Sequence, residues 1–378
     1  MNVYIDELAR SLARDGIGVD VFTRRHSRDV PATVIVEKGF AVHHLDAGPA
    51  REMDPQRTIR YMGAFAEEVI DALSFIPEAK LVHSHYWLSG WAGLRVKSAT
   101  GLPHVHSFHT LGRIKEMHRR SDDTPEALNR LAAEQEVIDG SDRIISSTET
   151  EKADLVRLYQ TDPTRICVSA PGVNHDLFMP GLQQSARIRL GWPEVPTLLY
   201  VGRIQPTKGT DVALEAFRIL ADQVEDSRLV IVGAPSGAVG ANEYDALQRR
   251  AKSLDLSDRV TFAEPVPHRE MPDVYRASDL VMVPSRSESF GLVAAEAMAS
   301  GVPVLAARVG GLNDVVGAGS GGVLVDGWDP ADWAQAALKV LSDPDRAGEL
   351  ARLGPRWAER FSWETAVDRI AEIYQDML

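Results

Sequence analysis

Short β-branched runs alternate with longer amphipathic stretches along most of the chain. The first stretch, residues 2–15, has apolar residues at helical spacing, and a β-branched run at 18–23 follows it. The apolar positions of that stretch are Val3, Ile5, Leu8, Leu12 and Ala13. Further strands are predicted at residues 80–84, 103–107, 143–147, 197–201, 228–232, 259–262, 280–283 and 303–306. Since helical patterns separate most of these strands, they predict an α/β protein whose parallel sheets are covered by helices on both faces.

A turn-rich stretch interrupts this alternation near the middle of the chain. It runs from residue 170 to residue 181, and a second series of strands and helices begins after it. The pattern predicts two doubly wound domains, residues 1–172 and 173–356, that face each other across a cleft. The helix expected at 357–378 would pack back on the first domain. In such sheets, ligands bind outside the carboxyl ends of the strands.

Composition narrows the class of protein. The 378 residues suffice for two or three domains, and 44% hydrophobic with 25% charged residues is typical of a globular chain. A net charge of −13 argues against nucleic-acid binding, which needs a basic surface. No apolar run reaches the roughly 20 residues of a transmembrane helix, and the first residues do not form a secretion signal, so we expect a cytoplasmic protein. The single cysteine, Cys167, excludes an intrachain disulfide and is expected to be a buried strand thiol.

The most informative segment lies at residues 284–304. It is typical of a strand end, a polar loop, a helix, a glycine stop and another strand. Ser287 or Ser289 is expected to cap the helix, whose free N–H groups would bind a diphosphate or sugar hydroxyls. Glu288 precedes the helix and Glu296 lies inside it. A carboxylate can accept hydrogen bonds from two neighbouring hydroxyls, so one glutamate would hold a ribose and the other a sugar ring, unless both are simply solvated. We assign the ribose to Glu296 and the sugar ring to Glu288.

A second segment, residues 199–210, follows the first strand of the second domain. Gly202 forms its turn, and Arg203 and Lys208 leave the strand end toward the cleft. These two cations would neutralise a nucleotide diphosphate. The alternative is a pair of solvated cations beside a turn.

The spacing of the two glutamates, within the Gly-Leu-Val and Gly-Val-Pro-Val frame of residues 284–304, resembles the GT4 family of retaining glycosyltransferases. The resemblance implies the GT-B fold of two Rossmann-like domains. It also implies that Arg203 and Lys208 bind the donor diphosphate and stabilise the departing nucleotide. The donor-binding residues that it implies are Gly202, Arg203, Lys208, Val266, Glu288, Phe290, Gly291, Leu292 and Glu296.

Clustered histidines follow two strands of the first domain. His83 and His85 point the same way along one strand, but no acidic residue completes a set of ligands nearby, so no metal site is predicted. The runs at 82–90 and 104–115 resemble acceptor-side motifs of the GT4 family, in which the histidine that matches His109 lies near the reacting sugar. The residues implied to be catalytic are His109, Arg203, Lys208 and Glu288.

Basic residues concentrate at 113–130 in this otherwise acidic chain. They are Arg113, Lys115, His118, Arg119, Arg120 and Arg130. They would form a pocket for a phosphorylated acceptor, although the neighbouring pair at 119–120 fits a solvated helix face better. The chain resembles the branch of the GT4 family that contains inositol phosphate glycosyltransferases and sucrose-phosphate synthases. That resemblance implies acceptor contacts from Tyr86, Thr110 and Arg130, to which the charge pattern adds Lys115.

Two departures from that branch affect these expectations. At residues 53–57 the family has a phosphate-binding lysine that this chain does not have. Family members also carry a strand and a Gly-Gly loop immediately before the residues that match Met1-Asn2-Val3-Tyr4. We therefore expect the first domain to lack its N-terminal strand, with a start placed too far downstream as the favoured explanation.

Together these features predict a glycosyltransferase. It would move a sugar, such as N-acetylglucosamine, from a UDP-sugar to a hydroxyl of a small phosphorylated polyol or sugar, with retention. The UDP-sugar is a substrate, so no cofactor is expected, and Mg²⁺ is permitted but not required. One alternative is an N-terminally truncated, catalytically weak sugar-nucleotide-binding protein, and another is a hexosyltransferase like sucrose-phosphate synthase. A homodimer is an open possibility.

Two other motifs are set aside. The G-x-G-x-x-G run at 317–322 precedes a strand, whereas the dinucleotide-binding fingerprint must follow one, which disfavours a nicotinamide-dependent enzyme. The Asp343-Pro344-Asp345 run resembles a metal-binding motif of other glycosyltransferases, but Asp345 is expected to cap a helix.

Overall fold

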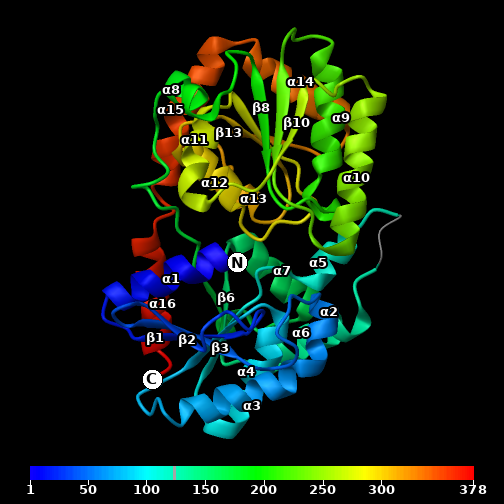
Figure 1. The fold of residues 1–378 in the computed structure, drawn as a ribbon. Helices are drawn as coiled ribbons and strands as arrows, with labels where there is room; N and C mark the ends of the chain where they lie inside the picture. The colour runs from blue at the N-terminus through cyan, green and yellow to red at the C-terminus, as the bar shows by residue number, and fades with distance from the viewer. Residues whose placement is uncertain (122–124) are drawn as a thin grey trace. The chain divides into compact units, whose positions relative to one another are not determined.

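The computed structural model, which describes residues 1–121 and 125–378, divides the chain into two units (Figure 1). The first unit contains residues 1–116, 125–172 and 363–378. The second contains residues 173–362 and the segment that begins at Met117. Within the described residues, every helix is too short or too polar to span a bilayer.

The second unit is built on one sheet of six parallel strands in the order β10-β9-β8-β11-β12-β13. The strands are β8 Thr197–Val201, β9 Arg228–Val232, β10 Val260–Ala263, β11 Leu280–Val283, β12 Val304–Ala307 and β13 Gly322–Val325. Most of their residues are buried, because helices cover both faces. The order is that of a Rossmann fold, and it reverses between β8 and β11.

Helices on both faces of this sheet follow the strands in turn. Figure 1 shows α9 and α10 on one side of the sheet and α11 and α12 on the other. The helices are α8 Gln183–Leu190, η3 Pro206–Lys208, α9 Thr210–Ala221, α10 Gly237–Ser253, η4 His268–Glu270, α11 Met271–Arg276, α12 Leu292–Ala299, α13 Leu312–Val315, α14 Pro330–Leu341 and α15 Pro344–Ala358.

The first unit contains two separate sheets. One has the order β1-β3-β2, and the other, which is parallel throughout, has the order β4-β5-β6-β7. The strands are β1 Val19–Arg24, β2 Thr33–Glu37, β3 Phe40–Leu45, β4 Val82–His85, β5 His104–Ser107, β6 Arg143–Ser146 and β7 Ile166–Val168. Cys167 lies on β7 as predicted, but it is half-buried.

The prediction that all sheets are parallel is wrong for β2, which pairs with β3 in an antiparallel hairpin. Neither strand was predicted, although the run from Thr33 to Glu37 is rich in β-branched residues. A two-residue turn joins the strands, and Gly39 supplies its positive φ of 84°. The hairpin thus adds an edge strand that needs no crossover helix.

The helices of the first unit complete two hydrophobic clusters around the β4 sheet. The helices are α1 Asn2–Arg14, α2 Pro55–Thr58, η1 Ile59–Tyr61, α3 Met62–Leu73, α4 Trp87–Thr100, α5 Gly112–Met117, α6 Leu128–Gly140, α7 Glu149–Tyr159, η2 Pro163–Arg165 and α16 Trp363–Gln375. One cluster joins α1 to α16, which are far apart in the sequence.

The buried face of α1 differs slightly from the predicted one. Tyr4 and Ala9 are buried together with the predicted Leu8 and Leu12, whereas Val3 is exposed. Tyr4 contacts Trp363 with a ring-to-ring distance of 5.5 Å. The phenol side chain therefore takes the place on the core face that the prediction gave to aliphatic residues.

A smaller correction concerns the start of α15. Asp343 caps this helix, because its Oδ1 accepts a hydrogen bond from the backbone N–H of Arg346 at 3.0 Å. Asp345, which was predicted to be the cap, lies in the first turn. A carboxylate is favourable at either place, since both are close to the positive end of the helix dipole.

Candidate active site

A cavity of about 110 Å³ lies where the strand order of the second unit reverses, between the carboxyl ends of β8 and β11. Crossover connections leave these two strands in opposite directions, which opens a crevice at this edge of the sheet. The residues that line the cavity are Tyr200, Val201, Gly202, Lys208, Val283, Ser285, Glu288, Leu292 and Val293. Four of the predicted donor-binding residues, namely Gly202, Lys208, Glu288 and Leu292, are therefore brought together.

Two close backbone contacts hold the loops around this cavity. The N–H of Gly202 donates to the carbonyl of Val232 at 3.0 Å, so the turns after β8 and β9 stay paired beyond the strands. A Cβ atom on Gly233 would lie 1.9 Å from the carbonyl oxygen of Gly202. A Cβ atom on Gly209 would lie 2.0 Å from the carbonyl oxygen of Pro284. Both glycines are required because the loops touch through their backbones.

The two predicted cations have different environments in this structure. Lys208 donates from Nζ to Glu288 Oε2 at 2.6 Å, and Ser285 Oγ donates to the same oxygen at 3.2 Å. Arg203 is exposed, and its guanidinium forms no hydrogen bond or ion pair with a described residue. The residue predicted to bind a diphosphate and the residue predicted to bind a hexose are thus paired with each other.

Glu296 is held from two directions inside the second unit. It lies on α12 with 7% of its surface exposed. His268 Nε2 is 2.8 Å from Oε1, and the Tyr275 hydroxyl donates to Oε2 at 2.9 Å. Burial and the Glu296 charge raise the pKa of Tyr275, so this phenol remains a donor. Both partners were missed, although His268 lies two residues after Val266, a predicted donor-binding residue, in the loop that follows β10.

Phe290 and Gly291 do not present ligand-binding side chains. The Phe290 ring is buried and packs edge-to-face on Phe361 at 5.2 Å, so it points into the core. Gly291 has a φ of 112°, and a Cβ atom there would lie 2.5 Å from Leu312 Cδ2. Only the backbone of these two residues is available to a ligand.

The predicted side-chain cap of α12 is wrong. The helix begins at Leu292, its N-cap is Gly291, and no described side chain forms a capping hydrogen bond. Ser287 and Ser289 lie too early in the loop to take that role. The N–H groups of the first turn are therefore not used by a side-chain cap. Leu292 and Val293 of this turn line the cavity, so this helix end is suited to bind an anion there.

The four predicted acceptor-binding residues gather in the first unit. Arg130 Nη2 donates to Thr110 Oγ1 at 3.1 Å, and the Arg130 guanidinium lies 5.7 Å from the centre of the Tyr86 ring. Glu126 joins Arg130 to Lys115, with Oε2 3.0 Å from Arg130 Nη1 and Oε1 3.4 Å from Lys115 Nζ. The group thus combines two cations, a hydroxyl and an aromatic face.

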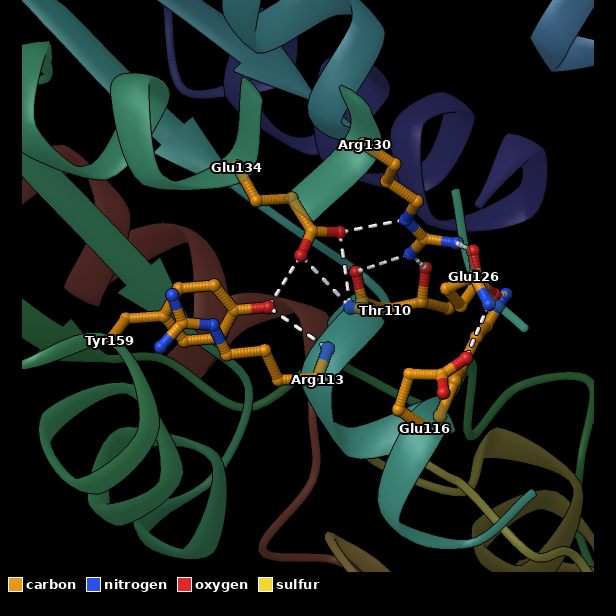
Figure 2. Close-up of polar contacts among 9 residues, drawn as sticks. Thr110, Arg113, Glu116, Glu126, Arg130, Glu134 and Tyr159 are labelled. Carbon is orange, nitrogen blue, oxygen red and sulfur yellow. Dashed lines mark hydrogen bonds and ion pairs between the residues drawn. The ribbon is translucent and has the colours of Figure 1, made fainter. Parts of the chain in front are cut away.

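Glu134, which lies beside Arg130 in Figure 2, holds this group in place. It is fully buried on α6 and accepts hydrogen bonds from the Gly112 N–H, from Arg130 Nε at 2.8 Å and from the Tyr159 hydroxyl. Burial and the Glu134 charge raise the pKa of Tyr159. The spacing of Arg130 and Glu134 on one helix face was visible in the sequence, but the partners from α5 and α7 were not.

The other basic residues predicted near this pocket do not join the group. Arg113 stacks on Tyr159, with its guanidinium carbon 4.5 Å from the ring centre. Arg120 belongs to the second unit, where it forms an ion pair with Glu243 at 3.2 Å. The basic concentration at 113–130 is therefore not a single pocket.

Five histidines form a network along β4, β5 and the turn after β5, in which His104 and His106 are buried and the other three are half-buried. His83 Nδ1 is 2.7 Å from the Tyr374 hydroxyl of α16, and His85 Nδ1 is 3.0 Å from His109 Nε2. Ser84 Oγ lies within 2.7 Å of ring nitrogens of both His104 and His106. His109, the predicted catalytic histidine, has a φ of 59° at the turn. Over residues 1–121 and 125–378, no three histidine, cysteine or acidic side chains are grouped to hold a metal ion.

Burial keeps these histidines neutral. It lowers the pKa of His85 to about 3 and, with a contribution from Lys97, that of His104 to about 4. The pKa of His83, His106 and His109 is also well below the ordinary value, with burial as the main cause. His109 is therefore an uncharged imidazole at neutral pH.

Comparison with known proteins finds relatives over almost the whole chain. A family model described as glycosyl transferases group 1 matches residues 183–357, and one described as glycosyl transferase 4-like domain matches residues 1–172. A D-inositol 3-phosphate glycosyltransferase of Thermobispora bispora is 43% identical over an alignment of 385 positions, which covers 100% of this chain and 90% of the relative. The protein of that name from Rhodococcus opacus is 43% identical over an alignment of 380 positions, which covers 99% of this chain and 85% of the relative.

Solved structures share the fold. Sucrose-phosphate synthase from Thermosynechococcus elongatus has a TM-score of 0.91 at 29% identity, and the match covers 99% of this chain and 92% of that chain. WaaG, a glycosyltransferase involved in lipopolysaccharide biosynthesis, has a TM-score of 0.74 at 19% identity, covering 98% of this chain and 95% of that chain. These likenesses confirm the predicted architecture of two Rossmann-like domains.

We predict that the histidine network makes the protein sensitive to mild acid. Each histidine has a lower pKa in the folded protein than its unfolded value of about 6.5, so its contribution to stability is complete above that pH and is lost as the pH falls. Each buried histidine should then remove up to about 1.4 kcal/mol from the free energy of unfolding per pH unit. Urea unfolding at pH 7.5, 6 and 5 measures this loss before most carboxylates titrate. Equal stability at pH 7.5 and 5 would contradict the neutral network.

Proposed function

This chain belongs to the group 1 glycosyl transferases and has the GT-B fold, and from that membership we propose that it transfers a sugar from a UDP-sugar to an inositol phosphate, with retention. The relatives that are 43% identical to it are named D-inositol 3-phosphate glycosyltransferases. The observation that carries the proposal is that Arg130 binds Thr110 and is bridged to Lys115 by Glu126 in the first unit, because two cations and a hydroxyl match a phosphate monoester.

The cavity at the strand reversal suits the donor. A diphosphate would meet Lys208, the exposed Arg203 and the first turn of α12, which together supply positive charge. Lys208 would exchange Glu288 for the diphosphate, which frees that carboxylate for sugar hydroxyls. Since side chains and a helix terminus meet the diphosphate charge, we expect turnover to require no metal.

Glu296 is suited to the ribose of the nucleotide. His268 and Tyr275 occupy one position on each of its oxygens, so each oxygen retains a second lone pair for a hydroxyl. The two partners also fix the direction of those lone pairs. N-acetylglucosamine is the sugar we propose, in keeping with the branch that the chain resembles.

The chemistry needs placement and charge stabilisation more than a protein nucleophile. The departing diphosphate gains negative charge as the glycosidic bond breaks, and Arg203 and Lys208 would stabilise that charge. The acceptor phosphate would position its hydroxyl through Arg130, Lys115 and Thr110. His109 adjoins Thr110 and, being neutral, can hydrogen-bond a sugar hydroxyl without adding charge.

A second candidate is hexosyl transfer to a sugar phosphate. The TM-score of 0.91 with sucrose-phosphate synthase favours it, and the same cations would bind either phosphate. We expect UDP release to be faster with inositol 3-phosphate than with fructose phosphate when both are offered with UDP-glucose and UDP-N-acetylglucosamine. Faster release with fructose phosphate would select the second candidate. If the protein binds UDP but releases no UDP with any donor and acceptor of the panel, the remaining explanation is a catalytically weak sugar-nucleotide-binding protein.

We predict that the double variant Arg203→Ala, Lys208→Ala binds UDP more weakly. Each lost charge-assisted hydrogen bond should cost about 1.5–3 kcal/mol of binding free energy. Calorimetric titration with UDP measures the effect, and Arg189→Ala is the control. Arg189 is an exposed arginine of α8 that forms an ion pair with Asp273, so its loss removes charge away from the cavity. Unchanged UDP affinity in the folded double variant would refute the diphosphate assignment.

We predict that Glu296 and Glu288 bind different parts of the donor, so their variants lose affinity for different ligands. Glu296→Gln should weaken binding of UDP itself, because the carboxamide replaces one acceptor oxygen with a donor. Glu288→Gln should spare UDP and weaken only the UDP-sugar. Titration of both variants with both ligands tests the split, and equal losses throughout would show that the roles are assigned wrongly.

A further inference from the structure

Two carboxylates neutralise the cations of the acceptor group, and they are held very differently (Figure 2). Glu134 is fully buried, and each of its oxygens accepts two hydrogen bonds from groups of the first unit. Glu126 lies just before α6, and its side chain is 23% exposed. Its carboxylate forms ion pairs with Arg130 and Lys115, and its backbone N–H donates to Glu116. Glu134 is therefore a fixed part of the site, whereas Glu126 can leave.

The carboxylate of Glu126 bridges the two cations with one oxygen each. Oε2 is 3.0 Å from Arg130 Nη1, and Oε1 is 3.4 Å from Lys115 Nζ. The neighbouring Nη2 of Arg130 binds Thr110 Oγ1 at 3.1 Å. Two oxygens of a phosphate monoester would satisfy the same two cations and leave a third oxygen for the hydroxyl.

Charge balance explains why a carboxylate occupies this position. Arg130 and Lys115 carry two positive charges, and Glu134 and Glu126 carry two negative ones, so the group is neutral as it stands. Burial and the nearby Arg130 lower the pKa of Lys115, which means that this ammonium group needs an anion beside it. An incoming neutral polyol that moved Glu126 would leave Lys115 without an anion and Arg130 with Glu134 alone, whereas a phosphate would replace the lost charge.

We propose that Glu126 is an exchangeable counter-ion that holds the place of the acceptor phosphate and is displaced only by an anionic ligand. It is thus a residue that selects for phosphorylated acceptors by competing with them. The inference rests on the proposed function of the acceptor group, and it adds that Glu126 competes with the acceptor phosphate for the two cations.

The first test measures binding of inorganic phosphate to the full chain by calorimetry, with saturating UDP to occupy the donor side. Glu126→Gln should tighten phosphate binding by about five- to tenfold, since phosphate no longer displaces a charge. Glu134→Gln should weaken it, because Arg130 loses its fixed support. Glu136→Gln is the matched control, because it changes the net charge by the same amount as Glu126→Gln. Glu136 is exposed on α6 and forms no hydrogen bond or ion pair with a described residue. We expect the phosphate affinity of this variant to stay within about twofold of the parent protein.

The second test is kinetic and separates competition from a structural role. With inositol 3-phosphate as acceptor, Glu126→Gln should lower KM for the acceptor and leave kcat unchanged, a pattern that loss of a structural ion pair would not produce. A lower melting temperature with unchanged phosphate affinity and KM would overturn the inference while the proposed function stands. Absence of phosphate binding in every variant and in the parent protein would overturn the proposed acceptor site and this inference with it.

Discussion

The reversal of strand order between β8 and β11 is the constraint on which the donor side depends. Since β8 connects toward β9 and β11 connects toward β12, no crossover covers the point where their carboxyl ends lie side by side. Loops from both strands reach that opening, which explains how Lys208 and Glu288, 80 residues apart in the chain, become partners at 2.6 Å. The glycine contacts then fix the loops at the backbone, so the side chains around the cavity start from rigid positions.

Both groups of site residues share an electrostatic arrangement. In the second unit Lys208 is bonded to Glu288, and in the first unit Arg130 and Lys115 share Glu126. A partly buried cation without an anion is costly, and this chain has a net charge of −13, so carboxylates are available to every such site. Anion binding at either place is therefore an exchange of partners. Its free energy is the difference between the free energies of two ion pairs, which is smaller than that of the stronger pair.

Much of the second unit was predictable because its strands are buried on both faces. The runs at 197–201, 228–232 and 280–283 coincide with β8, β9 and β11 as the structure has them. Paired residues on one helix, such as Arg130 and Glu134, were also visible. The hairpin of β2 and β3 was missed because no helical pattern separates its two strands. The burial of Tyr4 was missed because a residue with a hydroxyl group was not counted among the apolar positions of the helix.

The partners of the site residues were harder to predict than the residues themselves. His268 and Tyr275 lie more than 20 residues before Glu296, and Tyr159 lies 25 residues after Glu134, so only the packed fold brings them together. Glu126 carries no local signal, because an isolated acidic residue before a helix is usually a solvated charge. Spacing along one element can be seen in a sequence, whereas contacts between elements depend on how the core packs.

The packing of α16 on α1 has a consequence for the order in which the protein can fold. These helices share one hydrophobic cluster with residues of β5 and β6, although they are separated by almost the entire chain. This cluster of the first unit thus stays incomplete until residues 363–375 have been synthesised, by which time every strand of the second unit already exists. Contacts between segments so far apart in the sequence are expected to form late in folding.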